Sequence, residues 1–187
     1  MLWVMNPDDP RVRRTRQRLR AALLSLAAEQ ELASVTMAAV ARRAEVNRAT
    51  AYQHYADLDG LVADAMEDAV AHVARCAALC PLETPNDRTP EPLIDLFAHV
   101  AENAVLYRRM FAERGSARFA ELLRERVAGA LVVGFTEGRR PTAQSKVPPE
   151  LHASFVAGAL VGVVAASADG GRSPAVDARD TWLLLTR

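Results

Sequence analysis

Residues 36–55, TMAAVARRAEVNRATAYQHY, constrain the fold more than any other part of this chain. Thr36 has a good N-cap side chain, because its hydroxyl can accept a hydrogen bond from a free N–H in the first turn of a helix that begins at Met37. Asn47 is a second N-cap residue, and a second short helix is predicted over residues 48–54. Two short helices joined by a tight turn make a helix-turn-helix motif. The apolar residues on the buried face of the first helix are Met37, Val40, Ala41 and Ala44.

The second helix of this motif keeps a polar outer face. Val46 and Ala51 are its expected inward anchors, so few apolar residues remain on the other side. Its outer side chains can present hydrogen-bond donors and a methyl group to base edges and phosphates in a DNA major groove. The predicted DNA contacts are Thr36, Asn47, Arg48, Ala49, Thr50, Tyr52, Gln53, His54 and, on the preceding helix, Arg16.

The spacing T-x-x-x-V-A-x-x-A-x-V-N-x-x-x-x-Y-x-H-Y in this segment resembles the DNA-binding signature of the TetR family of transcriptional regulators. The resemblance continues on both sides, from Arg16 to Leu61. It implies a helix-turn-helix head followed by a helical body that binds a small-molecule effector and dimerises through its last two long helices. It further implies a repressor that binds a palindromic operator in double-stranded DNA as a homodimer and is released by the effector. A regulator without a small-molecule effector, or an activator, is the alternative.

Three positions depart from the family pattern. Glu45 stands where the turn usually has glycine, and a left-handed backbone there would cost about 1 kcal/mol. Asn47 replaces the usual Ser or Thr cap with a chemically equivalent one. Leu58 replaces a lysine that is common at the start of the next helix, which removes one expected phosphate contact.

Charge is divided unevenly along a chain whose net charge is zero. Residues 11–56 contain nine Arg and three Glu, whereas residues 57–187 contain 14 basic and 18 acidic residues. A basic head on an acidic body is expected when only one end of a protein meets DNA phosphates. The alternative is that the arginines of the first helix only solvate its surface. These are Arg11, Arg13, Arg14, Arg16, Arg18 and Arg20.

The sequence does not indicate a secreted or membrane protein. Residues 1–10, MLWVMNPDDP, are too short for a signal peptide and become acidic where a cleavage region should lie, so we expect a flexible leader. The longest uncharged apolar run, residues 153–168, falls short of the roughly 20 residues that a membrane span needs. We therefore expect a cytoplasmic protein with no membrane partner.

The remaining pattern predicts an all-α fold of about eight or nine helices, because apolar residues recur at helical spacing and strict alternation is absent. Proline- and glycine-bearing segments separate the helices. We expect a leader, a helix-turn-helix DNA-binding domain and a helical effector-binding and dimerisation domain, with boundaries at residues 1–10, 11–58 and 59–187. The predicted body helices cover residues 60–79, 91–112, 116–137, 149–168 and a last helix from Pro174.

The segment FVAGALVGVVAA, residues 155–166, is apolar on every side and must be covered on more than one face. Gly158 and Gly162 lie one turn apart and would let another helix approach closely. A second copy packed across a two-fold axis is the leading candidate for the second face. The alternative is the central core helix of a monomer. The predicted dimer interface consists of Phe155, Gly158, Ala159, Gly162, Val163, Trp182 and Leu185.

An effector site is predicted on the helix that follows residue 91, where aromatic side chains line one face and polar ones its flank. A mixed lining of this kind can bind a small molecule. The alternative is that the aromatic stripe is plain core. The candidates are Phe97, His99, Asn103, Tyr107, Met110 and Phe111.

Other chemistry has weak support in the sequence. His72, Cys76 and Cys80 lie at four-residue spacing on one helix face, so a metal or thiol sensor is an alternative to two small buried hydrophobes. We expect no metal site and no cofactor. We also expect no enzyme, because the sequence has no Gly-rich phosphate loop, no nucleophile motif and no paired carboxylates in a metal pattern.

Overall fold

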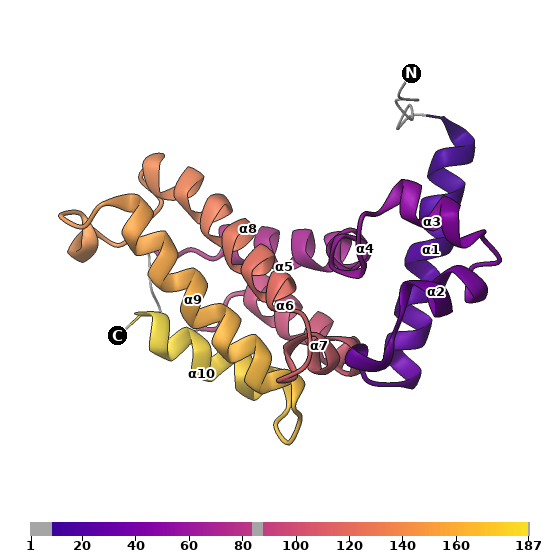
Figure 1. Cartoon of the computed structure of the whole chain (residues 1–187). Coiled ribbons are helices and arrows are strands. Elements are labelled where there is room, and N and C mark those ends of the chain that lie inside the picture. The colour runs from indigo at the N-terminus through magenta and orange to yellow at the C-terminus, as the bar shows by residue number, and fades with distance from the viewer. Residues whose placement is uncertain (1–8, 84–87, 187) are drawn as a thin grey trace.

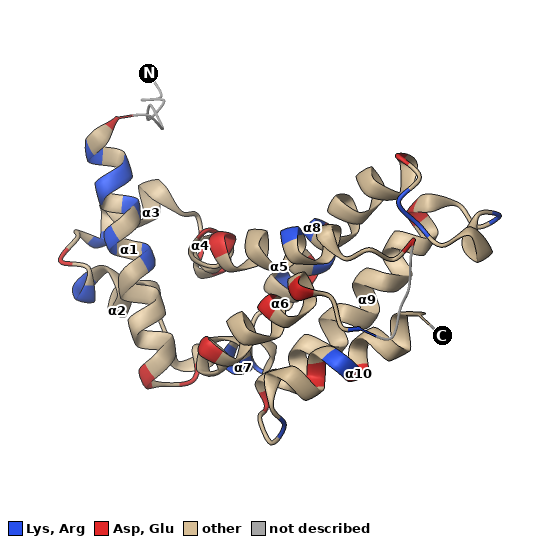
Figure 2. Cartoon of the chain, turned by 180° about the vertical axis from the view of Figure 1, so that it is seen from behind, with Lys and Arg blue, Asp and Glu red and all other residues tan. Residues whose placement is uncertain are grey.

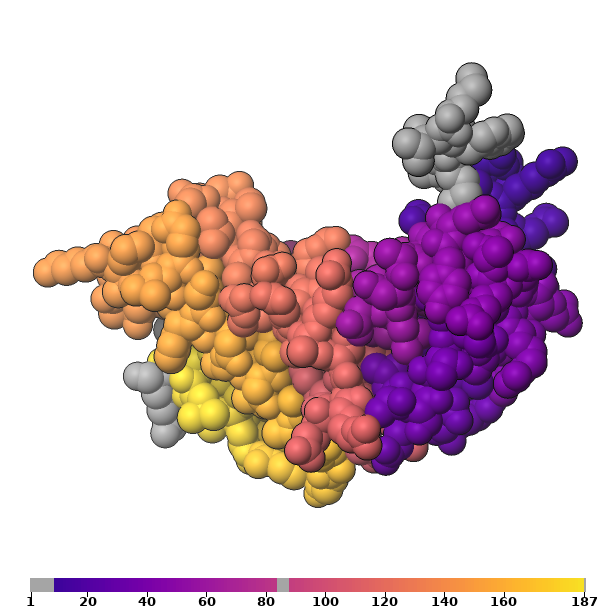
Figure 3. Space-filling view, viewed as in Figure 1, coloured from indigo at the N-terminus to yellow at the C-terminus, as the bar shows by residue number. Residues whose placement is uncertain are grey.

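The computed structural model describes residues 9–83 and 88–186, and within these ranges the chain forms ten α-helices, two short 3₁₀ helices and no strand (Figure 1). The expected all-α class is confirmed. Helices α1–α3 form a head at one end of the molecule, and α9 and α10 lie at the opposite end (Figure 3). The head elements are α1 Pro10–Glu29, η1 Leu32–Ser34, α2 Met37–Arg43 and α3 Arg48–His54. The following elements, which we call the body, are α4 Leu58–Ala65, α5 Glu67–Leu79, α6 Glu91–Glu102, α7 Ala104–Phe111, α8 Ala117–Thr136, η2 Thr142–Gln144, α9 Pro149–Ala168 and α10 Pro174–Thr186.

The head folds around α1, whose Leu19 and Leu23 are fully buried. α1 begins earlier than the predicted domain boundary. The Asp9 carboxylate accepts a hydrogen bond from the backbone N–H of Arg11 at 2.8 Å, and Pro10 occupies the first helical position, where its missing N–H costs nothing. The flexible leader therefore stays a prediction for residues 1–8 alone, which lie outside the described residues.

Two predicted helices are each divided in two, which is why the described helices outnumber the eight or nine expected. The helix predicted over residues 60–79 kinks at Met66, where φ is −94° and ψ is 0°. The helix predicted over residues 91–112 kinks at Asn103, where φ is −110° and ψ is 19°. The Asn103 amide donates to the backbone oxygen of His99 at 2.9 Å, and such a bond back to residue i−4 bends a helix. Met66 is buried, and the sequence around it has no residue that would break a helix in a comparable way.

The body is built on α5, which packs against α8 and α6. α9 packs along α8, and α10 packs against α6 and α9 (Figure 1). The largest fully buried side chains of the body include Trp182, Tyr107, Phe97 and Phe119, which come from four different helices. Two body helices, α4 and α7, contact head helix α1.

Helix α9 has 20 residues and a window of mean hydropathy 1.8, so its length and composition alone would allow it to cross a membrane. The expectation that it is too short is wrong, because the helix extends beyond the uncharged run to Pro149. α9 packs on α6, α7, α8 and α10, as a helix of a globular body does. Only a third of the apolar window is buried, so much of this apolar helix faces outward.

Candidate nucleic-acid interface and effector site

The two predicted N-caps of the helix-turn-helix are confirmed. The Thr36 hydroxyl accepts a hydrogen bond from the backbone N–H of Ala39 at 3.2 Å. The Asn47 side-chain oxygen accepts one from the backbone N–H of Ala49 at 2.8 Å. Both capping side chains are exposed. Their first role is to fix where α2 and α3 begin, and DNA contact by either of them stays a prediction.

Glu45 holds the turn between α2 and α3 in a left-handed conformation, with φ of 52°. The backbone N–H of Val46 donates to the Ala41 oxygen at 2.9 Å, and that of Glu45 donates to the Arg42 oxygen at 3.1 Å. These two bonds are those of a Schellman motif, which usually has glycine at the position of Glu45. Arg18 lies against the strained residue and forms an ion pair with its carboxylate at 3.0 Å.

The outer face of α3 is open to solvent. Arg48, Ala49 and Gln53 are exposed, Thr50 is half-buried, and the Tyr52 side chain is 44% exposed. The Arg48 guanidinium carbon lies 5.6 Å from the centre of the Tyr52 ring, which is cation–π distance. These side chains therefore share one surface that a DNA groove could reach.

His54 and Arg16 lie at the inner edge of this surface, beside buried Tyr55. Burial first, and the Arg16 charge second, lower the pKa of His54, so its ring is neutral at pH 7. The Arg16 guanidinium carbon lies 5.5 Å from the centre of the Tyr55 ring. The Tyr55 hydroxyl donates to the Asp64 carboxylate on α4, and this bond ties the end of α3 to the body. Burial also raises the pKa of Tyr55, which keeps the hydroxyl protonated as a donor.

Apart from Arg16, the basic residues of the head divide into two groups. Arg18, Arg20 and Arg43 form ion pairs with Glu45, Asp68 and Glu29, at 3.0, 3.1 and 2.7 Å respectively. The second group is exposed and, within the described residues, takes part in no ion pair. Figure 2 shows basic residues along α1 and on α2. The side chains that remain available to phosphates are therefore Arg11, Arg13, Arg14, Arg42 and Arg48.

Leu58, at the start of α4, packs partly against the apolar core. The Asp57 carboxylate caps this helix, accepting from the Gly60 N–H at 2.8 Å. An N-terminal helix end attracts anions, but the residues flanking Leu58 here are the acidic Asp57 and Asp59. Neither residue next to Leu58 is basic, so neither replaces the lysine that the family pattern has at this position.

The outward face of α9 is an apolar stripe. Phe155 is 72% exposed, and a Cβ added at Gly158 or Gly162 would meet no heavy atom within 4 Å. Trp182 was expected in the same interface, and this is wrong, because it is only 1% exposed within the single chain. Leu184 lies two positions after Trp182 on α10, and side chains two residues apart on a helix point in nearly opposite directions. Leu184 is accordingly exposed, at 77%. The exposed residues of this face of α9 are Leu151, Ser154, Phe155, Gly158, Ala159, Gly162 and Ala166, while Val163 of α9 and Leu185 of α10 are half-buried.

A pocket of about 360 Å³ lies between head helix α1 and the body. We call it the junction pocket. Its rim carries an ion pair between Arg20 of α1 and Asp68 of α5. The full lining is Arg20, Leu24, Ala65, Met66, Asp68, Ala69, His72, Arg75, His99, Asn103 and Leu106.

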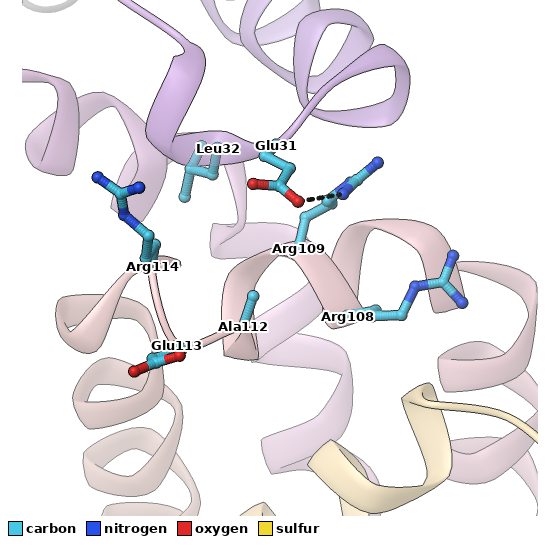
Figure 4. Close-up of a pocket in the computed structure, with 7 residues that line it drawn as sticks. All are labelled: Glu31, Leu32, Arg108, Arg109, Ala112, Glu113 and Arg114. Atoms are coloured by element: carbon cyan, nitrogen blue, oxygen red, sulfur yellow. Dashed lines mark ion pairs between the residues drawn. The ribbon is translucent and has the colours of Figure 1, made fainter.

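A second pocket, of about 250 Å³, lies between η1 and the α7–α8 turn. Figure 4 shows Glu31 and Arg109 facing each other across it, with an N–O distance of 3.9 Å. Arg114 extends toward the head, and most of the lining side chains are charged. The head is thus joined to the body by separate polar contacts at Asp64, Asp68 and Arg109.

The predicted effector residues are only partly brought together. His99 and Asn103 line the junction pocket. Phe97 and Met110 were expected in the same site, but they are buried in the core, as the alternative interpretation of the aromatic stripe predicts. Phe111 stacks in an aromatic cluster with Tyr107 and Phe119. Tyr107 is buried with a hydroxyl that has no partner among the described residues, and burial raises its pKa.

The sequence did not identify most of the junction pocket. Its walls come from α1, α4, α5, α6 and α7, so they lie far apart in the chain. His72 was singled out only for its spacing to two cysteines. No single stretch of sequence signals that Arg20 and Leu24 of the head face the body.

The cysteines behave as buried hydrophobes. Burial raises the pKa of Cys80 to about 12, and also raises that of Cys76. Within the described residues, no group of three or more His, Cys, Asp or Glu is placed to hold a metal ion. The His72 Nδ1 lies 3.1 Å from the Arg75 guanidinium nitrogen, and its Nε2 lies 3.5 Å from the Cys76 sulfur.

Residues 19–65 match the family model of "Bacterial regulatory proteins, tetR family". The match runs from the middle of α1 to the end of α4 and includes the whole helix-turn-helix. A comparison with curated protein sequences found no significant match.

Solved structures of similar fold cover nearly the whole chain. A TetR-family transcriptional regulator from Syntrophomonas wolfei is 15% identical with a TM-score of 0.66, over 92% of this chain and 93% of that one. Thermus thermophilus FadR, a TetR-family repressor in complex with lauroyl-CoA, is 22% identical with a TM-score of 0.60, over 91% and 92%. The dihydroxyacetone kinase operon activator DhaS is 17% identical with a TM-score of 0.59, over 91% and 93%. At these identities the likeness shows a shared fold, body included.

Proposed function

We propose that the chain, a TetR-family transcriptional regulator whose residues 19–65 match the tetR family model, is a repressor that binds a palindromic operator as a homodimer. The observation that carries this proposal is the outer face of α3, where Arg48, Thr50 and Tyr52 are accessible and Tyr52 lies under a guanidinium. A recognition helix of this kind contacts base edges from the major groove, while arginines around it contact phosphates.

The homodimer is proposed from the outward face of α9. It is an apolar stripe on a helix whose other side already packs on the body, and Leu184 of α10 is exposed as well. An exposed apolar face of this extent marks an interaction surface. Two-fold packing would present two heads to two half-sites about one DNA turn apart or slightly more.

Release by a small molecule is proposed from the junction between head and body. Head helix α1 packs on α4 and α7, polar contacts add to this packing, and a pocket lies directly beside one of those contacts. A ligand can shift DNA binding only if it has a different affinity for two arrangements of the protein. A site that touches both α1 and α5 meets this condition, because its shape depends on how the head is placed. The structure of FadR with lauroyl-CoA gives a precedent in a protein of this fold.

Two alternatives keep the DNA-binding role. The similarity to DhaS, an operon activator, supports activation as the alternative to repression. A regulator without an effector is the other alternative, and the junction pocket argues against it. Transcription from the chain's own promoter, measured with and without the protein, separates repression from activation.

DNase I footprinting on the DNA upstream of the gene tests the proposal. We expect an inverted repeat to be protected. Thr50→Ala and Tyr52→Ala should each weaken protection about tenfold or more, because one base contact is worth about 1–3 kcal/mol. Val133→Ala removes a side chain that is 55% exposed on α8, and it should leave the footprint unchanged. If both α3 variants protect the site as the wild type does, α3 is not the recognition helix.

A further inference from the structure

The junction pocket has a chemical character that narrows the class of effector. Its apolar wall includes Leu24 of the head and Met66 and Leu106 of the body. Its polar groups are concentrated on α5 and α6, with one arginine on α1. An apolar wall with a few converging polar groups is the usual composition of a small-molecule site.

His99 supplies an unused hydrogen-bond donor to this site. The Asn103 amide nitrogen lies 3.5 Å from its Nδ1 and donates to its backbone oxygen at 2.9 Å. Because an amide nitrogen can only donate, this contact favours Nδ1 as the acceptor and the ring proton on Nε2. That Nε2 is buried and has no partner within the described residues. Its ring packs 4.4 Å from the His72 ring, measured between centroids. A ligand oxygen that accepts a hydrogen bond would complete this group.

Among the residues that line the pocket, positive charges outnumber negative ones, while Glu102 outside the lining acts on His99 with the opposite sign. Arg20 and Arg75 contribute two positive charges to the lining, and Asp68 contributes one negative charge. Arg20 is only 27% exposed, whereas its partner Asp68 is 92% exposed. An ion pair with one partner so open to water contributes little to the free energy of folding. An incoming carboxylate can therefore replace Asp68 as the partner of Arg20 at small cost.

We propose that the junction pocket binds a small organic carboxylate, whose oxygens take over Arg20 from Asp68 and accept from His99 Nε2 while its apolar part lies against Leu24, Met66 and Leu106. This inference rests on the proposed function, because it identifies the class of effector that the regulator senses. The bound anion would touch α1 and the body at once. Its affinity would thus depend on the position of the head, which is the coupling that release from DNA requires.

The first experiment compares ligands that differ only in charge. Octanoate, decanoate and 4-phenylbutyrate are titrated into the full-length protein by calorimetry, each beside its neutral amide. We expect at least one carboxylate to bind about tenfold or more tightly than its amide, because hydrogen bonds to charged groups are the stronger ones. We also expect its binding to weaken as salt is raised. If no carboxylate binds, or if the amides bind equally well, the proposal is wrong.

The second experiment uses the two partners of the ion pair, whose substitution should have opposite effects. Arg20→Gln should weaken carboxylate binding about tenfold or more, while Asp68→Asn should strengthen it about two- to fivefold, because the competing carboxylate is gone. Both variants break the same contact between head and body. A purely structural role of the ion pair would therefore move binding in the same direction in both, and that result would overturn the proposal.

A matched control lies outside the pocket. Arg126→Gln breaks a similar ion pair, to Glu67 at 2.6 Å, between α8 and α5. It should leave carboxylate affinity unchanged. If it weakens binding as much as Arg20→Gln does, the charge dependence does not come from the junction pocket.

The DNA readout separates this inference from the proposed function. Operator binding by the ligand-free protein tests the regulator, and calorimetry tests the pocket. Carboxylate binding that follows the pattern above without a change in operator affinity would uphold the site and refute release by effector. Operator binding with no carboxylate binding would uphold the regulator and refute the site.

Discussion

Glycine in place of Glu45 should make the protein more stable than alanine in the same place does. A left-handed backbone, here φ of 52°, costs a residue with a Cβ about 1–2 kcal/mol. Glycine removes this strain but loses about 0.4–1 kcal/mol through the greater freedom of the unfolded chain. Both variants lose the ion pair to Arg18, whose partners are 44% and 85% exposed, so this loss cancels between them. Glu45→Gly should therefore be more stable than Glu45→Ala by about 1 kcal/mol.

Urea denaturation at one fixed protein concentration measures this difference in free energy of unfolding. A thermal melt should show it as a higher midpoint for Glu45→Gly, by about 2–4 °C for a domain of this size. Both variants also release Arg18 and remove a negative charge next to the recognition helix, so both should bind DNA more tightly at low salt. If Glu45→Ala is as stable as Glu45→Gly, the left-handed turn does not store the strain assigned to it.

The remaining predictions concern DNA affinity, the dimer and pH. Leu58→Lys should strengthen DNA binding and steepen the dependence of log K on log salt by about one unit; an unchanged slope in anisotropy titrations would mean that this position does not face a phosphate. Phe155→Glu, on the outward face of α9, should give a folded monomer in light scattering, whereas Leu160→Glu should unfold the body, because Leu160 is 2% exposed. Stability should fall as the pH is lowered below the ordinary histidine pKa of 6.5, because the unfolded state then binds protons that the folded state does not; a flat profile of melting midpoint between pH 7 and 5 would contradict the burial of these rings. The histidines whose pKa is lowered by burial are His54, His99 and His152.

The glycines of α9 offer a cleaner test of the dimer than its large side chains do. A Cβ at Gly162 or at Gly129 of α8 would meet no heavy atom within 4 Å, so leucine at either position fits the single chain. Gly162→Leu should prevent close approach of a second α9 and shift the protein to monomers in light scattering. Gly129→Leu should remain dimeric. Monomers from both variants, or from neither, would place the interface elsewhere.

Local signals in the sequence predicted the head well, and contacts between distant segments were harder to foresee. Thr36 and Asn47 cap their helices as expected because capping depends on residues two or three positions away. The strain at Glu45 follows from the same local pattern. By contrast, the kink at Met66 has no proline or glycine to announce it.

The effector site and the dimer face were also hard to predict, because both depend on contacts between segments that lie far apart in the sequence. Periodicity identified α9 as overly apolar, but it did not separate outward Leu184 from inward Trp182 on α10, because that depends on which face packs on α6 and α9. Arg20 was expected among phosphate contacts or solvated arginines. Instead it crosses to Asp68, and only the packing of α1 against the body brings them together.

Selection of bound sequences from random DNA duplexes by the purified full-length protein tests the central claim most directly. The account predicts enrichment of an inverted repeat whose half-sites lie about one helical turn apart or slightly more, and loss of that enrichment in Thr50→Ala and Tyr52→Ala. Enrichment of a single unrepeated site, or the same inverted repeat selected by both variants, would contradict the assignment of α3 as the recognition helix of a two-fold dimer.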